Sequence, residues 1–96
     1  MNYIIKNYKL FLSDRYGNTG RQISENVQFA TWSESQRIFL VTQSDGKVIT
    51  KDNNGNSIRR ICDGAIEAKF EGENILVRTR NGNQLLDKYG NLIRRM

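Results

Sequence analysis

The sequence predicts an all-β protein built from tandem four-stranded antiparallel meander repeats, and three observations support this prediction. The pattern D-x-x-G-N-x-x-R-x-[IM] occurs three times, beginning at Asp14, Asp52 and Asp87, with spacings of 38 and 35 residues. Between the copies, apolar residues alternate with polar ones or form short runs, which is typical of strands. No segment shows the 3.6-residue periodicity of an amphipathic helix. A recurrence at this period indicates a repeat protein.

The repeated pattern is typical of a tight hairpin turn. Its Asp side chain can accept backbone N–H groups, and its Gly can occupy a left-handed conformation without steric strain. Nine residues are therefore expected to be structural: Asp14, Gly17, Asn18, Asp52, Gly55, Asn56, Asp87, Gly90 and Asn91. If Asp52 pairs with Asn56 across a three-residue loop, Thr50 faces Ile58 and Val48 faces Arg60. Both faces of such a hairpin are part apolar, so we expect both to be covered.

The N-terminal unit, residues 3–24, is expected to be a partial repeat of three strands. Tyr3-Ile4-Ile5 and Leu10-Phe11-Leu12 are two short β-prone runs, separated by Lys6 and Asn7. Residues 19–24 form the return strand after the first repeated turn.

The second unit, residues 27–62, is expected to hold four strands. Residues 27–33 alternate, which places Val27 with Phe29 and Thr31 on one face and Ala30 with Trp32 on the other. Residues 37–43 form a near-continuous apolar run, as in a central strand. An Asp-Gly turn at 45–46 leads to strands at 47–52 and 57–62.

The third unit, residues 65–96, repeats this arrangement with shorter loops. Strands are expected at 65–70, 74–77, 84–87 and 92–96, and Phe70 takes the position that Trp32 holds in the second unit. The three units together predict eleven strands in one domain.

The succession of residues 37–41, 47–52, Gly55-Asn56 and 58–61 resembles one blade of a β-propeller. The resemblance is architectural and indicates no specific family, because the W-D, G-H and double-glycine marks of known propeller classes are absent. It implies a ring, and rings of this kind contain about 4–8 blades. Because the chain has fewer than three complete units, we expect self-association, with a dimer favoured. The alternative is a three-sheet prism or trefoil-like barrel that closes within one chain.

The composition limits the kinds of catalytic site and metal site that the chain can form. The 96 residues contain no histidine, which excludes Ser-His-Asp, Cys-His and histidine-zinc sites. The single cysteine, Cys62, cannot form an internal disulfide and is expected to be a small buried side chain. The Asn-rich loop after Asp52 lacks the alternating acidic residues of a calcium loop. We therefore expect no enzyme activity, no cofactor and no metal. Without an apolar run long enough for a membrane span or a signal-peptide pattern, a cytoplasmic location is expected.

A formal charge of +5 suggests an anionic partner. Arg21, Arg59 and Arg94 share one repeat position, where they either pair with neighbouring units or bind anions. The candidate ligand residues are Arg21, Arg59, Arg60, Arg94, Arg95, Tyr16, Tyr89 and Trp32, with Arg78, Arg80 and Lys88 extending a basic surface. Trp32 either packs between units or forms a stacking platform, as in sugar-binding propellers that the chain resembles. The sequence thus predicts a self-associating, non-catalytic interaction module that binds proteins, or alternatively a polyanion (nucleic acid) or carbohydrate binder.

Overall fold

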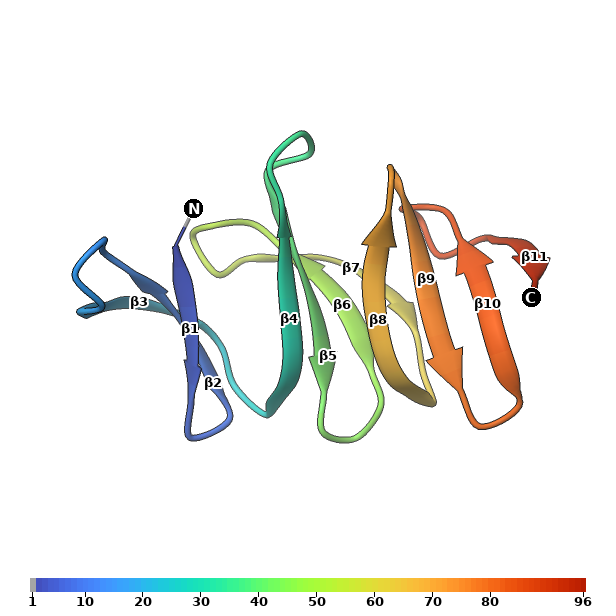
Figure 1. Ribbon diagram of the computed structural model, residues 1–96, viewed down its shortest axis with the longest axis horizontal. Helices are drawn as coiled ribbons and strands as arrows, with labels where there is room; N and C mark the ends of the chain where they lie inside the picture. The colour runs from blue at the N-terminus through green and yellow to red at the C-terminus, as the bar shows by residue number, and fades with distance from the viewer. Residues whose placement is uncertain (1) are drawn as a thin grey trace.

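A computed structural model describes residues 2–96, and its eleven strands form three antiparallel sheets (Figure 1). The strands are β1 (Tyr3–Lys6), β2 (Lys9–Ser13), β3 (Thr19–Ser24), β4 (Val27–Ser33), β5 (Ile38–Gln43), β6 (Val48–Lys51), β7 (Ser57–Cys62), β8 (Ala65–Glu71), β9 (Asn74–Thr79), β10 (Gly82–Leu86) and β11 (Leu92–Arg95). The prediction of an all-β chain with eleven strands is confirmed.

Each sheet is a meander in which strands that follow one another in sequence are hydrogen-bonded neighbours. The N-terminal sheet contains β1–β3, the middle sheet contains β4–β7, and the C-terminal sheet contains β8–β11. The sheets follow one another in a row that measures 40 × 26 × 20 Å, with the chain ends at opposite sheets (Figure 1). Over residues 2–96 the row closes into neither a barrel nor a ring, so the alternative of a single-chain prism or barrel is wrong.

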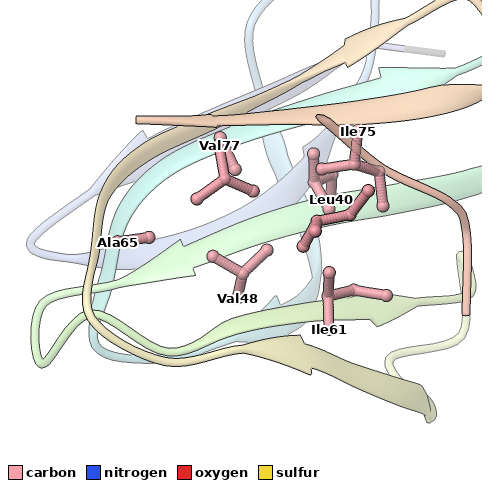
Figure 2. Packing of buried hydrophobic residues seen from close by; sticks show 8 residues of the cluster. Leu40, Val48, Ile61, Ala65, Ile75 and Val77 are labelled. Atoms are coloured by element: carbon pink, nitrogen blue, oxygen red, sulfur yellow. The ribbon is translucent and has the colours of Figure 1, made fainter. Parts of the chain in front are cut away.

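Two hydrophobic clusters hold the row together, one at each junction between sheets. Phe39 and Val41 of the middle sheet pack with Leu10 and Ile23 of the N-terminal sheet. On its other face, Leu40 and Val48 pack with residues that include Ile75 and Val77 of the C-terminal sheet (Figure 2). The middle sheet is therefore covered on both faces along β5 and at Val48, as its two-sided apolar pattern predicts, whereas the turn end of β7 is exposed, with Ile58 at 53%.

The two terminal sheets each leave one face open. In the N-terminal sheet, Ile4 pairs with Phe11 just as Val41 pairs with Ile49, but Ile4 is 38% exposed whereas Val41 is fully buried. We call this side the head face. In the C-terminal sheet, Leu76 holds the position of the buried Leu40 but is only half-buried. We call that side the tail face.

The predicted register of the second repeated hairpin is wrong beyond its first pair. Lys51 faces Ser57, but Thr50 faces Arg59 rather than Ile58, and Val48 faces Cys62 rather than Arg60. The register shifts between Thr50 and Lys51 and again between Val48 and Ile49. A β-bulge inserts an extra residue in one strand and reverses its alternation, which a simple count along the sequence does not show.

The predicted faces of β4 are also wrong at its first residue, because of another bulge. The register shifts between Val27 and Phe29, and Val27 lies in the same cluster as Ala30 and Trp32 rather than with Phe29 and Thr31. The equivalent strand β8 shifts at the matching place, between Ala65 and Glu67. The bulge is therefore a repeated feature that turns the first residue of each four-stranded sheet toward the core.

Candidate functional site

The repeated turns are held by one hydrogen-bond pattern that occurs in all three copies. In the middle copy, Asp52 Oδ1 accepts the backbone N–H groups of Asn54 and Asn56, each at 2.9 Å, and Oδ2 accepts Asn56 Nδ2 at 3.2 Å. The first and third turns repeat these bonds around Asp14 and Asp87. The glycines have φ between 85° and 89°. All three turns therefore have the same hydrogen-bonded form, and in the second and third turns the third residue, Asn54 or Tyr89, meets an arginine of the preceding sheet.

These bonds make the turns sensitive to acid. Hydrogen bonds, led by the backbone N–H of the Asn at the fifth position, hold the pKa of Asp14, Asp52 and Asp87 below the ordinary value of 3.8. A carboxylate with a lowered folded-state pKa stabilises the fold above its unfolded-state pKa, and this contribution is lost as the pH falls through the folded value. We expect thermal midpoints to be flat above about pH 5 and to fall below about pH 4.

The Asp52→Asn variant, which keeps one acceptor oxygen, tests this acid dependence. We expect the variant to have a lower thermal midpoint at pH 7 and a smaller decrease on acidification to pH 2.5. An acid-induced decrease equal to that of the wild type would show that the Asp52 carboxylate does not contribute.

The second and third turns each pack on the last strand of the preceding sheet. A Cβ atom on Gly55 would lie 3.4 Å from the Ile23 carbonyl oxygen, and one on Gly90 would lie 2.6 Å from the Ile61 carbonyl oxygen. A Cβ on Gly17 would meet nothing within 4 Å, since no strand of residues 2–96 packs on this turn. The turn at Gly17 therefore lacks the contact with a preceding strand that the turns at Gly55 and Gly90 both make.

The repeated arginine reaches from one sheet to the turn tip of the next. Arg21 Nη1 donates to Asn54 Oδ1 at 3.4 Å, and the Arg59 guanidinium lies 5.2 Å from the centre of the Tyr89 ring. The first two copies of this arginine therefore meet a neighbouring unit, and their partners are the side-chain amide of Asn54 and the aromatic ring of Tyr89. Arg94 pairs with Leu85 in the β10–β11 ladder, and its exposed side chain makes no hydrogen bond, ion pair or ring contact with residues 2–96.

The Arg59–Tyr89 contact lies in a groove of about 450 Å³ between the middle and C-terminal sheets. Its walls carry two cations and an aromatic face, because Lys88 Nζ lies 5.5 Å from the same Tyr89 ring. The groove is lined by Ser35, Gln36, Ile38, Thr50, Ile58, Arg59, Glu73, Lys88 and Tyr89. We call it the Arg–Tyr groove. Such a combination can bind an anion through the cations while a planar group stacks on the ring.

The other candidate ligand residues lie apart from this groove. Arg60 pairs with Asp63 at 3.6 Å, and Arg95 is exposed at the end of β11. Trp32 is partly buried, with its ring centre 4.6 Å from that of Phe39 and its indole N–H donating to Glu34. It packs at the first junction rather than forming an open platform. Tyr16 is 76% exposed in the first turn, with Arg15 over its ring at 5.1 Å.

Cys62 is half-buried, and burial raises the pKa of its thiol to about 11, with a smaller effect from Asp63. At neutral pH the side chain is therefore a thiol, which is a weak nucleophile and metal ligand. Among residues 2–96, no three Cys, Asp or Glu side chains come together as metal ligands. In the same residues, the structure contains no helix of the length and apolar character that crossing a membrane requires.

No protein-family model matches this chain, and no curated protein matches it. Its function must therefore be inferred from the faces and the groove described above.

The sequence pattern indicated Arg59, Lys88 and Tyr89 but not the rest of the Arg–Tyr groove. Gln36 and Glu73 belong to two hairpin loops 37 residues apart, and Gln36 Nε2 donates to the Glu73 carbonyl oxygen at 3.3 Å. Both loops hold the same position within their units, so stacking the two units in register would have brought them together. The sequence alone contained no information on that stacking direction.

Proposed function

We propose that this chain is a non-catalytic interaction module that associates with copies of itself, so that blade-like sheets from different chains continue the row. The observation that carries this proposal is the contrast between equivalent positions. Val41 and Leu40 are buried between sheets, whereas their counterparts Ile4 and Leu76 lie on open faces. Terminal units of a repeat array need either a polar cap or a partner.

The two open faces differ in chemistry. The head face carries Ile4 and Phe11, whose counterparts in the middle sheet are the buried Val41 and the partly buried Ile49. On the tail face, Arg78 and Asn83 replace Thr42 and Val48, and Arg78 pairs with Glu67 at 3.4 Å. A contact between copies is therefore expected to be more polar than either internal junction, and so weaker and reversible.

The number of sheets favours a dimer. Two chains would place six sheets in one ring, within the range of about 4–8 blades in known propellers. Multi-angle light scattering and sedimentation velocity over about 1–200 μM provide the test, with the mass expected to approach twice that of one chain as the concentration rises. A single-chain mass throughout that range would contradict the proposal.

A second candidate function is the binding of a polyanion or a glycan, and the Arg–Tyr groove is the observation that favours it. Arg59 and Lys88 flank the Tyr89 ring at 5.2 and 5.5 Å, in a groove with room for a sugar or nucleotide unit. Phosphate or sulfate groups would pair with the cations while a ring stacks on Tyr89.

Binding to heparin and to single-stranded oligonucleotides, measured against salt, tests this second candidate. The double variant Arg59→Ala/Lys88→Ala is expected to weaken binding about tenfold or more and to flatten its salt dependence. The double variant Lys47→Ala/Arg80→Ala removes the same charge from hairpin loops away from the groove and serves as the control. Equal losses in both variants would indicate a general effect of net charge, and binding to neutral glycans lost in Tyr89→Ala would favour a sugar ligand.

A further inference from the structure

The Arg–Tyr groove is built from residues at fixed repeat positions, so its counterparts can be located elsewhere in the chain. Arg59 comes from the last strand of one sheet, whereas Lys88 and Tyr89 come from the turn of the next sheet. At the first junction the same positions hold Arg21, Asn53 and Asn54, without a second cation or an aromatic ring. The third set of positions holds Arg94, Arg15 and Tyr16, which restores both features.

The halves of this third set lie at opposite ends of the row. Arg94 belongs to β11 on the C-terminal sheet, and Arg15 and Tyr16 belong to the turn between β2 and β3 on the N-terminal sheet (Figure 1). The half at the turn already has the arrangement of its counterpart, since Arg15 lies 5.1 Å from the Tyr16 ring and Lys88 lies 5.5 Å from the Tyr89 ring. The Arg94 side chain is exposed and makes no hydrogen bond, ion pair or ring contact within residues 2–96.

The turn at Gly17 also has space for the contact that the other two turns make. Gly55 packs against the Ile23 carbonyl oxygen and Gly90 against the Ile61 carbonyl oxygen, and Met96 holds the repeat position of those isoleucines. Gly17 has open space on this side, and Met96 is 62% exposed at the far end of the row. The turn and the strand end are thus two matching surfaces without a partner.

We propose that copies of this chain associate head to tail, with the tail face of one copy on the head face of the next, and thereby assemble a second Arg–Tyr groove. Arg94 of one copy and Arg15 and Tyr16 of the next would form its cationic and aromatic walls. This inference rests on the self-association proposed above and adds its direction and the site that it completes. Both internal junctions already join sheets in this direction. A tail-to-tail contact would instead gather Arg78 and Arg94 of both copies in one interface, where like charges repel.

Two blocking variants test the direction of association. The head-blocked variant, Ile4→Glu, and the tail-blocked variant, Leu76→Glu, each place a charge at the counterpart of a buried position. In a head-to-tail assembly each variant alone lacks an intact interface, whereas a one-to-one mixture has one. Sedimentation velocity of the mixture is therefore expected to show a heterodimer, weaker than the wild-type assembly but at least about tenfold tighter than either variant alone. Circular dichroism checks that both variants are folded.

Two milder variants probe the assembled groove without altering either apolar face. Arg94→Ala and Tyr16→Ala are each expected to weaken wild-type association about two- to fivefold, because each removes one side of an exposed cation–π contact. Arg80→Ala, an exposed arginine in the β9–β10 hairpin, is the charge-matched control and is expected to leave association unchanged. These variants also serve if a blocking variant does not fold.

The outcomes separate the two proposals. Wild-type protein that remains a single chain at every concentration would overturn both self-association and its direction. Wild-type association that persists in either blocked variant alone, or a mixture no tighter than its components, would overturn the head-to-tail arrangement while self-association stands. Association that is insensitive to Arg94→Ala and Tyr16→Ala would show that no second Arg–Tyr groove forms.

Discussion

Replacing Leu40 with alanine is expected to lower the free energy of unfolding by about 2–5 kcal/mol, the range for large-to-small substitutions in protein cores. Leu40 is fully buried in the cluster that joins the middle and C-terminal sheets (Figure 2). The substitution removes apolar contacts with both sheets and leaves a cavity, since a β-sheet junction cannot collapse freely around a missing side chain. Urea denaturation followed by circular dichroism measures the change.

Leu76→Ala is the matched control, because Leu76 holds the same repeat position on the tail face and is only half-buried. Measured at a concentration where the protein is a single chain, it is expected to lower the free energy of unfolding by less than half as much as Leu40→Ala. Equal effects of the two substitutions would contradict the assignment of the tail face as open.

Replacing Gly90 with alanine is expected to destabilise the fold by about 2–5 kcal/mol, from two sources. The backbone of Gly90 has φ +89°, where an alanine is strained by about 1–2 kcal/mol. Its Cβ would also lie 2.6 Å from the Ile61 carbonyl oxygen, which forces the turn away from β7 and adds about 1–3 kcal/mol of overpacking. Denaturant titration of the variant measures the sum.

Gly17→Ala isolates the first source. Gly17 has φ +85°, but the Cβ atom of an alanine at this position would meet nothing within 4 Å, so only the backbone strain of about 1–2 kcal/mol is expected. The difference between the two variants then reports the contact between the third turn and the middle sheet. If Gly17→Ala destabilised the single chain as much as Gly90→Ala, the third turn would not be packed as described.

The strands and turns were predictable because they depend on local chemistry. Asp, Gly and Asn at fixed spacing specify a turn by hydrogen bonds within five residues, and all three copies form them. The apolar runs between the turns specify strands of known length. The two-sided apolar character of the middle unit likewise indicated a sheet that is covered on both faces, which the two clusters confirm.

The register and the groove were not predictable in the same way. The shift between Thr50 and Lys51, which recurs between Leu85 and Leu86, inserts an unpaired residue that a simple count along the two strands does not show. The partner of Arg59 is Tyr89, 30 positions along the chain, and their contact depends on how one sheet stacks on the next. A repeat position identifies equivalent residues, but only the three-dimensional stacking shows which copies meet.

The row of sheets behaves as a short one-dimensional lattice, because the principal contacts between sheets join neighbours. The middle sheet has two such contacts and each terminal sheet has one, so opening should begin at the ends and reach the centre last. One more four-stranded unit would therefore lengthen the array without any change to its internal junctions. The turn of the added sheet would pack on the last strand of the sheet before it, as the turns at Gly55 and Gly90 do.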